Sequence, residues 1–162
     1  MTLSIRPATL DDTAAIWAIL EPTIRAGETY TLDRDMPEVD ALAYWFGTDK
    51  AVFVAEEDGV ILGTYYLRAN QAGGGAHVCN CGYMTGAAAT GRGVARAMAL
   101  HSFEQAKACG FRAMQFNFVV ASNTRAVGLW QSLGFDIVGR LSGAFAHPAR
   151  GFVDALVMFR AL

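Results

Sequence analysis

The pattern of hydrophobic and polar positions divides this chain into strands and helices. Short apolar runs predict strands at about 3–7, 51–56, 60–68, 76–85, 113–119, 136–141 and 152–160. Apolar residues at helical spacing predict helices that follow Asp12, span about 38–46, run from a glycine-rich segment to Cys109, and follow Asn123. Strands and helices are therefore both predicted along the chain, which places it in the α/β class.

Several residues mark where these elements turn or end. Asp58-Gly59 lies between two apolar runs and predicts a tight hairpin turn. Gly110 and Gly134 each follow a helical pattern, as expected of residues that end a helix. Pro22 lies inside the first helical pattern, so we expect it to bend or interrupt that helix.

A glycine-rich segment, Thr90-Gly91-Arg92-Gly93-Val94-Ala95, separates the strand that ends near Thr85 from the long helix. The first N–H groups of a helix have no partner inside it and lie at the positive end of the helix dipole. Glycines at this position let a phosphate group reach the bare backbone. The segment therefore predicts a phosphate-binding site.

Two common phosphate loops do not fit this segment. The dinucleotide fingerprint G-x-G-x-x-G needs a third glycine where Arg96 stands, and it should follow the first strand of a βαβ unit. A Walker loop ends in Gly-Lys-Ser or Gly-Lys-Thr, and neither triplet occurs in the sequence. NAD and ATP are therefore disfavoured as ligands.

A second segment, Asn123 to Phe135, predicts an amphipathic helix. Its apolar face is formed by Ala126, Leu129, Trp130 and Leu133. Ser122 or Asn123 can cap the start of this helix. A packed helix explains the apolar positions, but it does not explain why a glycine-rich loop precedes it by about thirty residues.

Together the two segments resemble the GCN5-related N-acetyltransferase (GNAT) family. Its acetyl-CoA loop has Arg or Gln, two residues, Gly, one residue, then Gly or Ala; Gly93 and Ala95 match, and Thr90 departs from it. Its later motif has Asn, Ala, a hydrophobic residue, usually Tyr, and Leu-Gly-Phe, as in Asn123–Phe135. The resemblance covers nearly the full chain. The length of 162 residues predicts one domain over residues 1–162. The resemblance implies the order β-α-α-β-β-β-α-β-α-β-β and a mixed sheet in which two adjacent parallel strands splay apart to admit the cofactor.

The resemblance implies acetyl-CoA as the co-substrate and assigns residues to it. The pyrophosphate is expected at Thr90, Gly91, Arg92, Gly93, Val94, Ala95 and Arg96. The pantetheine arm is expected to pair with the strand at Tyr83, Met84 and Thr85, and Asn123 and Trp130 are expected to contact the cofactor. Most of these contacts involve the backbone, so the replacement of the usual Arg or Gln by Thr90 is expected to weaken cofactor binding only modestly.

The sequence departs from the family pattern at the positions of the general acid and the general base. Trp130 stands where the family often has a tyrosine that protonates the departing CoA thiolate, and an indole N–H is a donor without a proton to give at neutral pH. Water, Tyr83 or another hydroxyl takes that role, or the thiolate leaves unaided. Many relatives also have a glutamate as general base on the strand that corresponds to Ala76–Thr85, where this chain has none.

His77, Asn80 and Asn117 are the candidate catalytic residues. His77 is a candidate because histidine is the side chain that most often serves as a general base near neutral pH. Asn80 and Asn117 are polar residues in apolar strands, either as hydrogen-bonded core amides or as ligands of the acceptor. Cys79 and Cys81 form a C-x-C pair without further ligands; such cysteines are usually buried and inert, and no metal is expected.

The two asparagines also resemble a pair that yeast-type proline-analogue N-acetyltransferases place at the acceptor. An asparagine takes no proton, so Asn80 and Asn117 would act by orienting the amine. The acceptor pocket is expected to draw on the loop at 27–30, with Glu28 and Tyr30, and on a link at 143–151, with His147 and Arg150. Phosphinothricin acetyltransferases have a similar size and a similar loop after the first helix.

Composition limits the possible partners and the setting. The net charge of −2 and the scattered arginines disfavour nucleic acid. Residues 69–91 carry no Asp, Glu, Lys or Arg but hold several amide side chains, which disfavours a membrane span.

The three cysteines and the absence of a leader pattern favour a cytoplasmic location. A hydrophobic content of 53% with 17% charged residues suggests that a second subunit covers some surface, as in a homodimer.

The sequence thus predicts an acetyl-CoA-dependent N-acetyltransferase that acts by direct attack of a small amine, an amino acid or an analogue. Two alternatives stay open at this point. A non-catalytic acyl-CoA-binding module is consistent with the missing tyrosine and glutamate. An enzyme that acetylates protein N-termini or lysines would need a groove wide enough for a peptide.

Overall fold

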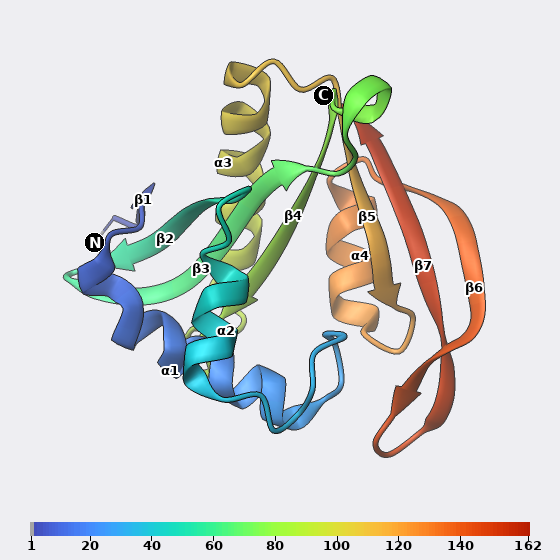
Figure 1. The fold of residues 1–162 in the computed structure, drawn as a ribbon, viewed down its shortest axis with the longest axis horizontal. Helices are drawn as coiled ribbons and strands as arrows, with labels where there is room; N and C mark the ends of the chain where they lie inside the picture. The colour runs from blue at the N-terminus through green and yellow to red at the C-terminus, as the bar shows by residue number, and fades with distance from the viewer. Residues whose placement is uncertain (1) are drawn as a thin grey trace.

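Seven strands form one mixed sheet in the order β1-β2-β3-β4-β5-β7-β6 in the computed structural model, which describes residues 2–162. The strands are β1 Ser4–Pro7, β2 Ala51–Glu57, β3 Val60–Ala69, β4 Val78–Thr85, β5 Ala113–Val120, β6 Asp136–His147 and β7 Gly151–Ala161. All neighbouring strands are antiparallel except β4 and β5, which are parallel. The predicted mixed α/β fold is confirmed (Figure 1).

Helices cover both faces of this sheet. The α-helices are α1 Thr13–Ala26, α2 Glu38–Trp45, α3 Val94–Ala108 and α4 Thr124–Ser132. One apolar core joins α1 and α2 to β2, β3 and β4, and the other joins α3 and α4 to the opposite side chains of the same strands and to β5 and β7. Within residues 2–162, no helix is long and apolar enough to cross a membrane.

The hairpin and helix ends follow the glycine signals. Asp58 and Gly59 both have positive φ angles, 52° and 80°, as the tight turn between β2 and β3 requires. Gly110, with φ of 86°, follows α3. Of the two effects expected of Pro22, interruption of the first helix does not occur, because α1 continues to Ala26 and buries apolar residues on both sides of the proline. Tertiary packing of these residues outweighs the backbone hydrogen bond that proline cannot donate.

The last two strands form a longer hairpin than the sequence indicated. β6 continues through the segment that was expected to link the strands, and only residues 148–150 remain as the turn. Two register shifts in its pairing with β7, one at 137–139 and one at 141–145, let β6 continue over this irregular stretch.

The parallel strands β4 and β5 pair only at their first residues. Their ladder contains Val78 with Ala113 and Cys79 with Met114, and no later pair within the described residues. Beyond that point β4 stays paired with β3 as far as Thr85, and β5 stays paired with β7 as far as Val120. The two strands therefore diverge, as Figure 1 shows between the ribbons labelled β4 and β5.

Candidate active site

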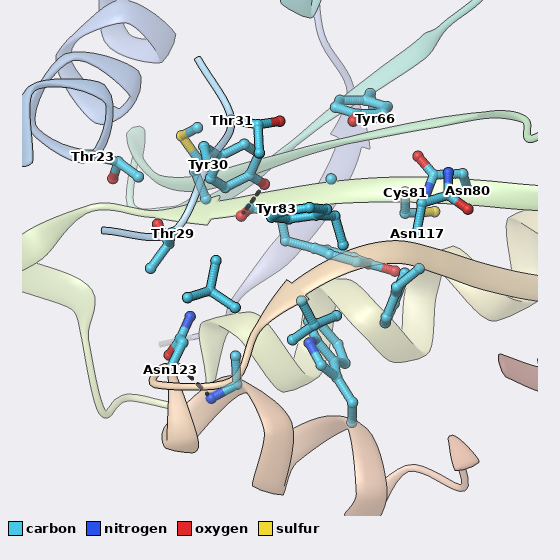
Figure 2. Close-up of a pocket in the computed structure, with 18 of the residues that line it drawn as sticks. Thr23, Thr29, Tyr30, Thr31, Tyr66, Asn80, Cys81, Tyr83, Asn117 and Asn123 are labelled. Carbon is cyan, nitrogen blue, oxygen red and sulfur yellow. Dashed lines mark hydrogen bonds between the residues drawn. The ribbon is translucent and has the colours of Figure 1, made fainter. Parts of the chain in front are cut away.

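A cleft of about 520 Å³ opens where β4 and β5 diverge. Its walls come from the α1–α2 loop at Thr29–Thr31, from β4 at Asn80–Thr85, from β5 at Phe116–Val120 and from the start of α4 (Figure 2). Side chains of α1, α2 and β3 also line it, so segments that are distant in sequence meet at one opening in the sheet. A gap between two strands of a sheet gives a ligand access to unpaired backbone groups on both sides.

The pairing of β3 with β4 determines which side chains face each side of this cleft. Tyr66 is the partner of Gly82, and Arg68 is the partner of Asn80. These pairs point to the face covered by α1 and α2, because Tyr66 belongs to the core of those helices and partners share a face. Tyr83 points the other way, toward α3. The cleft therefore has an α1–α2 side and an α3–α4 side.

Asn80 lies on the α1–α2 side and is buried. Its side-chain nitrogen donates a hydrogen bond to the backbone carbonyl of Gln115 at 2.9 Å. This contact lies one residue beyond the last main-chain pair of β4 and β5. The amide therefore bridges the two strands at the point where they begin to separate.

Asn117 lies in the same cleft but is exposed. Its side-chain nitrogen donates to Asn70 Oδ1 at 2.6 Å, and its Oδ1 accepts from Gln115 Nε2 at 3.0 Å. Asn80 and Asn117 are thus both linked to Gln115, the first through its backbone and the second through its side chain. Figure 2 shows the two asparagines close together at one end of the cleft.

Tyr83 and Trp130 form the apolar wall on the α3–α4 side. Their ring centroids are 5.1 Å apart, and Trp130 also packs against Phe116 at 4.7 Å. The Tyr83 hydroxyl lies 2.7 Å from Ser102 Oγ and 3.6 Å from the sulfur of Met114, so it is bonded to the protein interior. Burial raises the pKa of Tyr83 well above its usual value.

The two cysteines of β4 are buried thiols. Burial raises the pKa of Cys79 to about 12, and it also raises the pKa of Cys81. A thiol that stays protonated at neutral pH is a poor nucleophile and a poor metal ligand. No group of three His, Cys, Asp or Glu side chains in residues 2–162 is placed to hold a metal ion.

Tyr30 connects the α1–α2 loop to β4. Its hydroxyl donates to the backbone carbonyl of Tyr83 at 2.8 Å, and its ring lines the cleft. The pKa of Tyr30 is raised by burial, so this hydroxyl stays a donor at neutral pH. The loop is therefore held over the strand whose backbone borders the opening (Figure 2).

The start of α3 presents free backbone donors. Gly91 and Gly93 have φ angles of 81° and 79°, and no side chain caps the helix that begins at Val94. Nothing lies within 4 Å of the place where a side chain at Gly93 would begin. Open space beside uncapped N–H groups fits a phosphate or pyrophosphate. Arg92 is exposed and forms an ion pair with Glu57, while Arg96 is exposed nearby.

Asn123 caps α4, since its side-chain oxygen accepts a bond from the N–H of Ala126 at 3.4 Å. Asn123 and Thr90 both line the main cleft. Thr90 follows the end of β4 and precedes α3, and Asn123 follows the end of β5 and precedes α4. Gly91 to Arg96 lie outside the cleft lining, in the exposed turn and the first turn of α3. The residues expected to bind acetyl-CoA therefore form one path from the cleft to the start of α3.

A second cavity of about 310 Å³ adjoins the main cleft and shares Thr29 and Asn123 with it. Its charged or titratable lining residues are Glu28, His147 and Arg150. His147 Nδ1 accepts hydrogen bonds from the backbone N–H groups of Ala149 and Arg150, at 3.1 and 3.2 Å, and so shapes the turn before β7. The residues expected to bind the acceptor thus lie together beside the cleft. One of the two ring nitrogens of His147, Nδ1, is already occupied by hydrogen bonds within its own turn.

His77 is placed apart from the other candidates. It lies in the turn before β4, is exposed and is not a lining residue of either cavity. Its backbone carbonyl accepts a bond from the N–H of Arg112 at the closed end of the two strands. A catalytic role for His77 is not supported by this placement, because β4 begins two residues later than the apolar run indicated and the site opens farther along it.

Tyr44, Tyr66 and Arg68 are among the lining residues on the α1–α2 side that sequence reasoning missed. Tyr44 and Tyr66 look like core aromatics, and their rings do pack edge to face at 6.3 Å. Arg68 looks like the polar end of a strand. Only the cross-strand pairing of Arg68 with Asn80 brings it to the cleft, and no local signal reports that pairing.

The sequence profile of the Acetyltransferase (GNAT) family matches residues 15–135. The chain belongs to the GNAT family. Solved structures agree with this assignment: a GCN5-related N-acetyltransferase from Kribbella flavida is 42% identical, with a TM-score of 0.94 over 99% of this chain and 98% of the other. The family assignment makes the protein an enzyme, an N-acetyltransferase that uses acetyl-CoA.

Two proteins of lower sequence identity are also similar to it. N-acetyltransferase aca1 from Schizosaccharomyces pombe is 26% identical over 151 residues, which cover 83% of this chain and 72% of that protein. A phosphinothricin acetyltransferase from Sinorhizobium meliloti, solved with acetyl-CoA, is 21% identical, with a TM-score of 0.87 over 100% of this chain and 89% of the other. The latter likeness shows a shared fold.

Proposed function

We propose that this GNAT enzyme transfers the acetyl group of acetyl-CoA to a small amine, an amino acid or an analogue, by direct attack. The observation that carries the proposal is that Asn80 and Asn117 lie in one cleft on the α1–α2 side, linked through Gln115. Two amides at the point where the sheet opens can hold an amine beside a thioester that enters from the other side.

In this proposal acetyl-CoA binds along the path from the start of α3 to the opening of the sheet. Its pyrophosphate is held by backbone N–H groups within Gly91 to Arg96, apart from that of Arg92, which already donates to the Ala89 carbonyl at 3.2 Å. Its pantetheine arm pairs with the β4 backbone at Tyr83–Thr85. The divergence of β5 supports the assignment, because within residues 2–162 no strand pairs with this edge of β4 there, although the Tyr83 carbonyl already accepts a bond from the Tyr30 hydroxyl. Thr90, Asn123 and Trp130 complete the cofactor wall.

The reaction needs a neutral amine next to the thioester carbon. The amine nitrogen forms a bond to the carbonyl carbon, the bond from that carbon to sulfur breaks, and the nitrogen loses a proton. Asn80 and Asn117 orient the amine but take no proton. Water carries the proton, since within residues 2–162 no Asp, Glu or His lines the main cleft. The CoA thiolate leaves with little assistance, because a thiol of pKa about 8.5 is a fair leaving group.

The test is release of the free CoA thiol from acetyl-CoA with a panel of acceptors. Free amino acids and their analogues, including L-proline and phosphinothricin, are compared with short peptides that carry a free N-terminus or a lysine. Turnover with free amino acids and little with peptides is the expected result. Turnover restricted to peptides would replace the proposal by a protein acetyltransferase, and a cleft of about 520 Å³ argues against that outcome.

We also propose that residues 1–162 form a single domain, because both apolar cores pack on the same sheet. A homodimer and a cytoplasmic location stay predictions from the sequence. Exposed apolar side chains on the edge strand β6 and on β7, namely Ile137, Val138, Leu141 and Phe152, offer a surface that a second subunit could cover. Sedimentation at micromolar concentration tests this, with a monomer mass as the contradicting result.

A further inference from the structure

Arg68 is the one charged side chain among the residues that line the main cleft, within the described part of the chain. It lies near the end of β3 and is the cross-strand partner of Asn80. The two side chains therefore share the α1–α2 face of the sheet and are close neighbours. A single cation in an otherwise neutral cleft creates a local preference for an anion.

The guanidinium of Arg68 has more donors than partners. Its Nη1 makes one long contact of 3.4 Å with Asp49 Oδ2, and the Asp49 side chain is 59% exposed. Its Nε is buried, and no hydrogen-bond partner for that atom lies within residues 2–162. An arginine carries five N–H donors, so most of them are left for another group. A buried donor without a partner carries a desolvation cost that an acceptor at this position would relieve.

A second cation reinforces the charge at this end of the cleft. Lys50 Nζ lies 3.9 Å from the centre of the Tyr44 ring and 4.9 Å from that of Tyr66, and both rings line the cleft. Burial lowers the pKa of Lys50, and the charge of Arg68 lowers it further, while Asp49 acts in the opposite direction. Two cations thus face one exposed carboxylate here, although the whole chain has a net charge of −2.

We propose that Arg68 binds the carboxylate of the acceptor and so makes the enzyme selective for amines that carry an anionic group. A planar guanidinium matches a carboxylate with two parallel N–H bonds. In an amino acid the amine and the carboxylate are attached to one carbon atom, so neighbouring side chains such as Asn80 and Arg68 can contact both. The inference rests on the proposed function, because it assigns the acceptor of that reaction.

Arg68 is poorly placed to bind the phosphates of acetyl-CoA instead. The glycine loop follows the end of β4 at Thr85, whereas Arg68 is opposite Asn80 near the beginning of that strand. Five residues of extended strand separate the two positions by about 16 Å. Loss of Arg68 is therefore expected to leave acetyl-CoA binding unchanged.

The test compares each free L-amino acid with its primary amide, beginning with L-proline and L-prolinamide. CoA release is measured for the wild type, Arg68→Gln, Arg68→Lys and the control Arg112→Gln, an exposed arginine outside both cavities. Each variant's acid-to-amide ratio of kcat/KM is divided by that of the wild type, which cancels the intrinsic difference in amine reactivity. Thermal unfolding and the KM for acetyl-CoA are measured in parallel.

We expect the acid-to-amide ratio to fall by about 10- to 100-fold in Arg68→Gln, which corresponds to the loss of a charged hydrogen-bonded pair. Arg68→Lys should keep part of the preference, and Arg112→Gln all of it. An unchanged ratio in Arg68→Gln, or a wild type that uses amides as well as acids, would overturn the role of Arg68 but leave acetyl transfer intact. A wild type that releases no CoA thiol with any amine would overturn the proposed function and this inference with it.

Discussion

The side-chain amide of Asn80 donates to the backbone carbonyl of Gln115 across the first gap between β4 and β5, at 2.9 Å. Main-chain pairing of these strands ends one residue earlier, so a side chain continues the ladder by one step. This bond fixes the plane of the amide. A structural role and a functional role therefore coincide in Asn80, and the two can be separated by experiment.

Asn80→Ala is expected to lower turnover by at least about 100-fold, because the amine loses a group that orients it beside the thioester. The same change leaves the Gln115 carbonyl without its donor, which should cost about 1–3 kcal/mol of unfolding free energy. The KM for acetyl-CoA should stay within about threefold, since the cofactor path begins farther along β4. Steady-state kinetics and urea unfolding provide these values. Turnover close to that of the wild type would remove Asn80 from the catalytic proposal.

Tyr83→Phe is expected to retain turnover within a few-fold of the wild type. The Tyr83 hydroxyl is bonded to Ser102 on the α3 side, so it is not free to protonate a thiolate in the cleft. The substitution should instead lower stability by about 1 kcal/mol through the lost hydrogen bond. Rates measured from pH 6 to 10 serve as the readout, with Trp130→Phe as a companion variant that removes the indole N–H. A loss of 100-fold or more in Tyr83→Phe would identify that hydroxyl as the general acid.

Gly82→Ala is expected to impair acceptor binding. A Cβ atom at Gly82 would lie 2.4 Å from Tyr66 Cε2, so the ring must move, and this ring both lines the cleft and packs on Trp45. We expect a stability loss of about 1–3 kcal/mol and a higher acceptor KM, with little change in the KM for acetyl-CoA.

The matched control for this variant is Gly128→Ala on the exposed side of α4, where no atom lies within 4 Å of the new methyl group. It should raise stability by about 0.5–1 kcal/mol, because alanine loses less conformational freedom than glycine in a helix. Equal effects of the two substitutions on acceptor KM would show that the fit between Gly82 and Tyr66 does not shape the cleft.

The features that the sequence predicted correctly depend on local signals. The turn at Asp58-Gly59, the glycine-rich entry to α3 and the cap at Asn123 are each encoded within a few residues, and the structure has all three. Two motifs in the right order were enough to predict the family and its fold. The cleft between β4 and β5 followed from the resemblance and not from the hydrophobic pattern.

The features that the sequence missed depend on contacts between distant segments. Arg68 becomes a cleft residue only because β3 pairs with β4 while β5 turns away. Pro22 stays inside a helix because Ile16 and Ile24 are buried on either side of it. His77 falls outside the site because β4 starts at Val78. Composition and periodicity report none of these relationships, since each is determined by tertiary packing.

Folding stability is expected to decrease as the pH falls below about 6.5, because of His101. His101 Nδ1 lies 2.7 Å from the Tyr65 hydroxyl, and partial burial against Phe53 lowers the pKa of the ring. The unfolded chain then binds a proton at a higher pH than the folded one, so acid favours unfolding. Urea unfolding at pH 7.5, 6.5 and 5.5 should show this loss in the wild type and a smaller loss in His101→Gln, which keeps an acceptor for Tyr65. His77→Gln is the control at an exposed position. An identical pH dependence in the wild type and in His101→Gln would show that another group causes it.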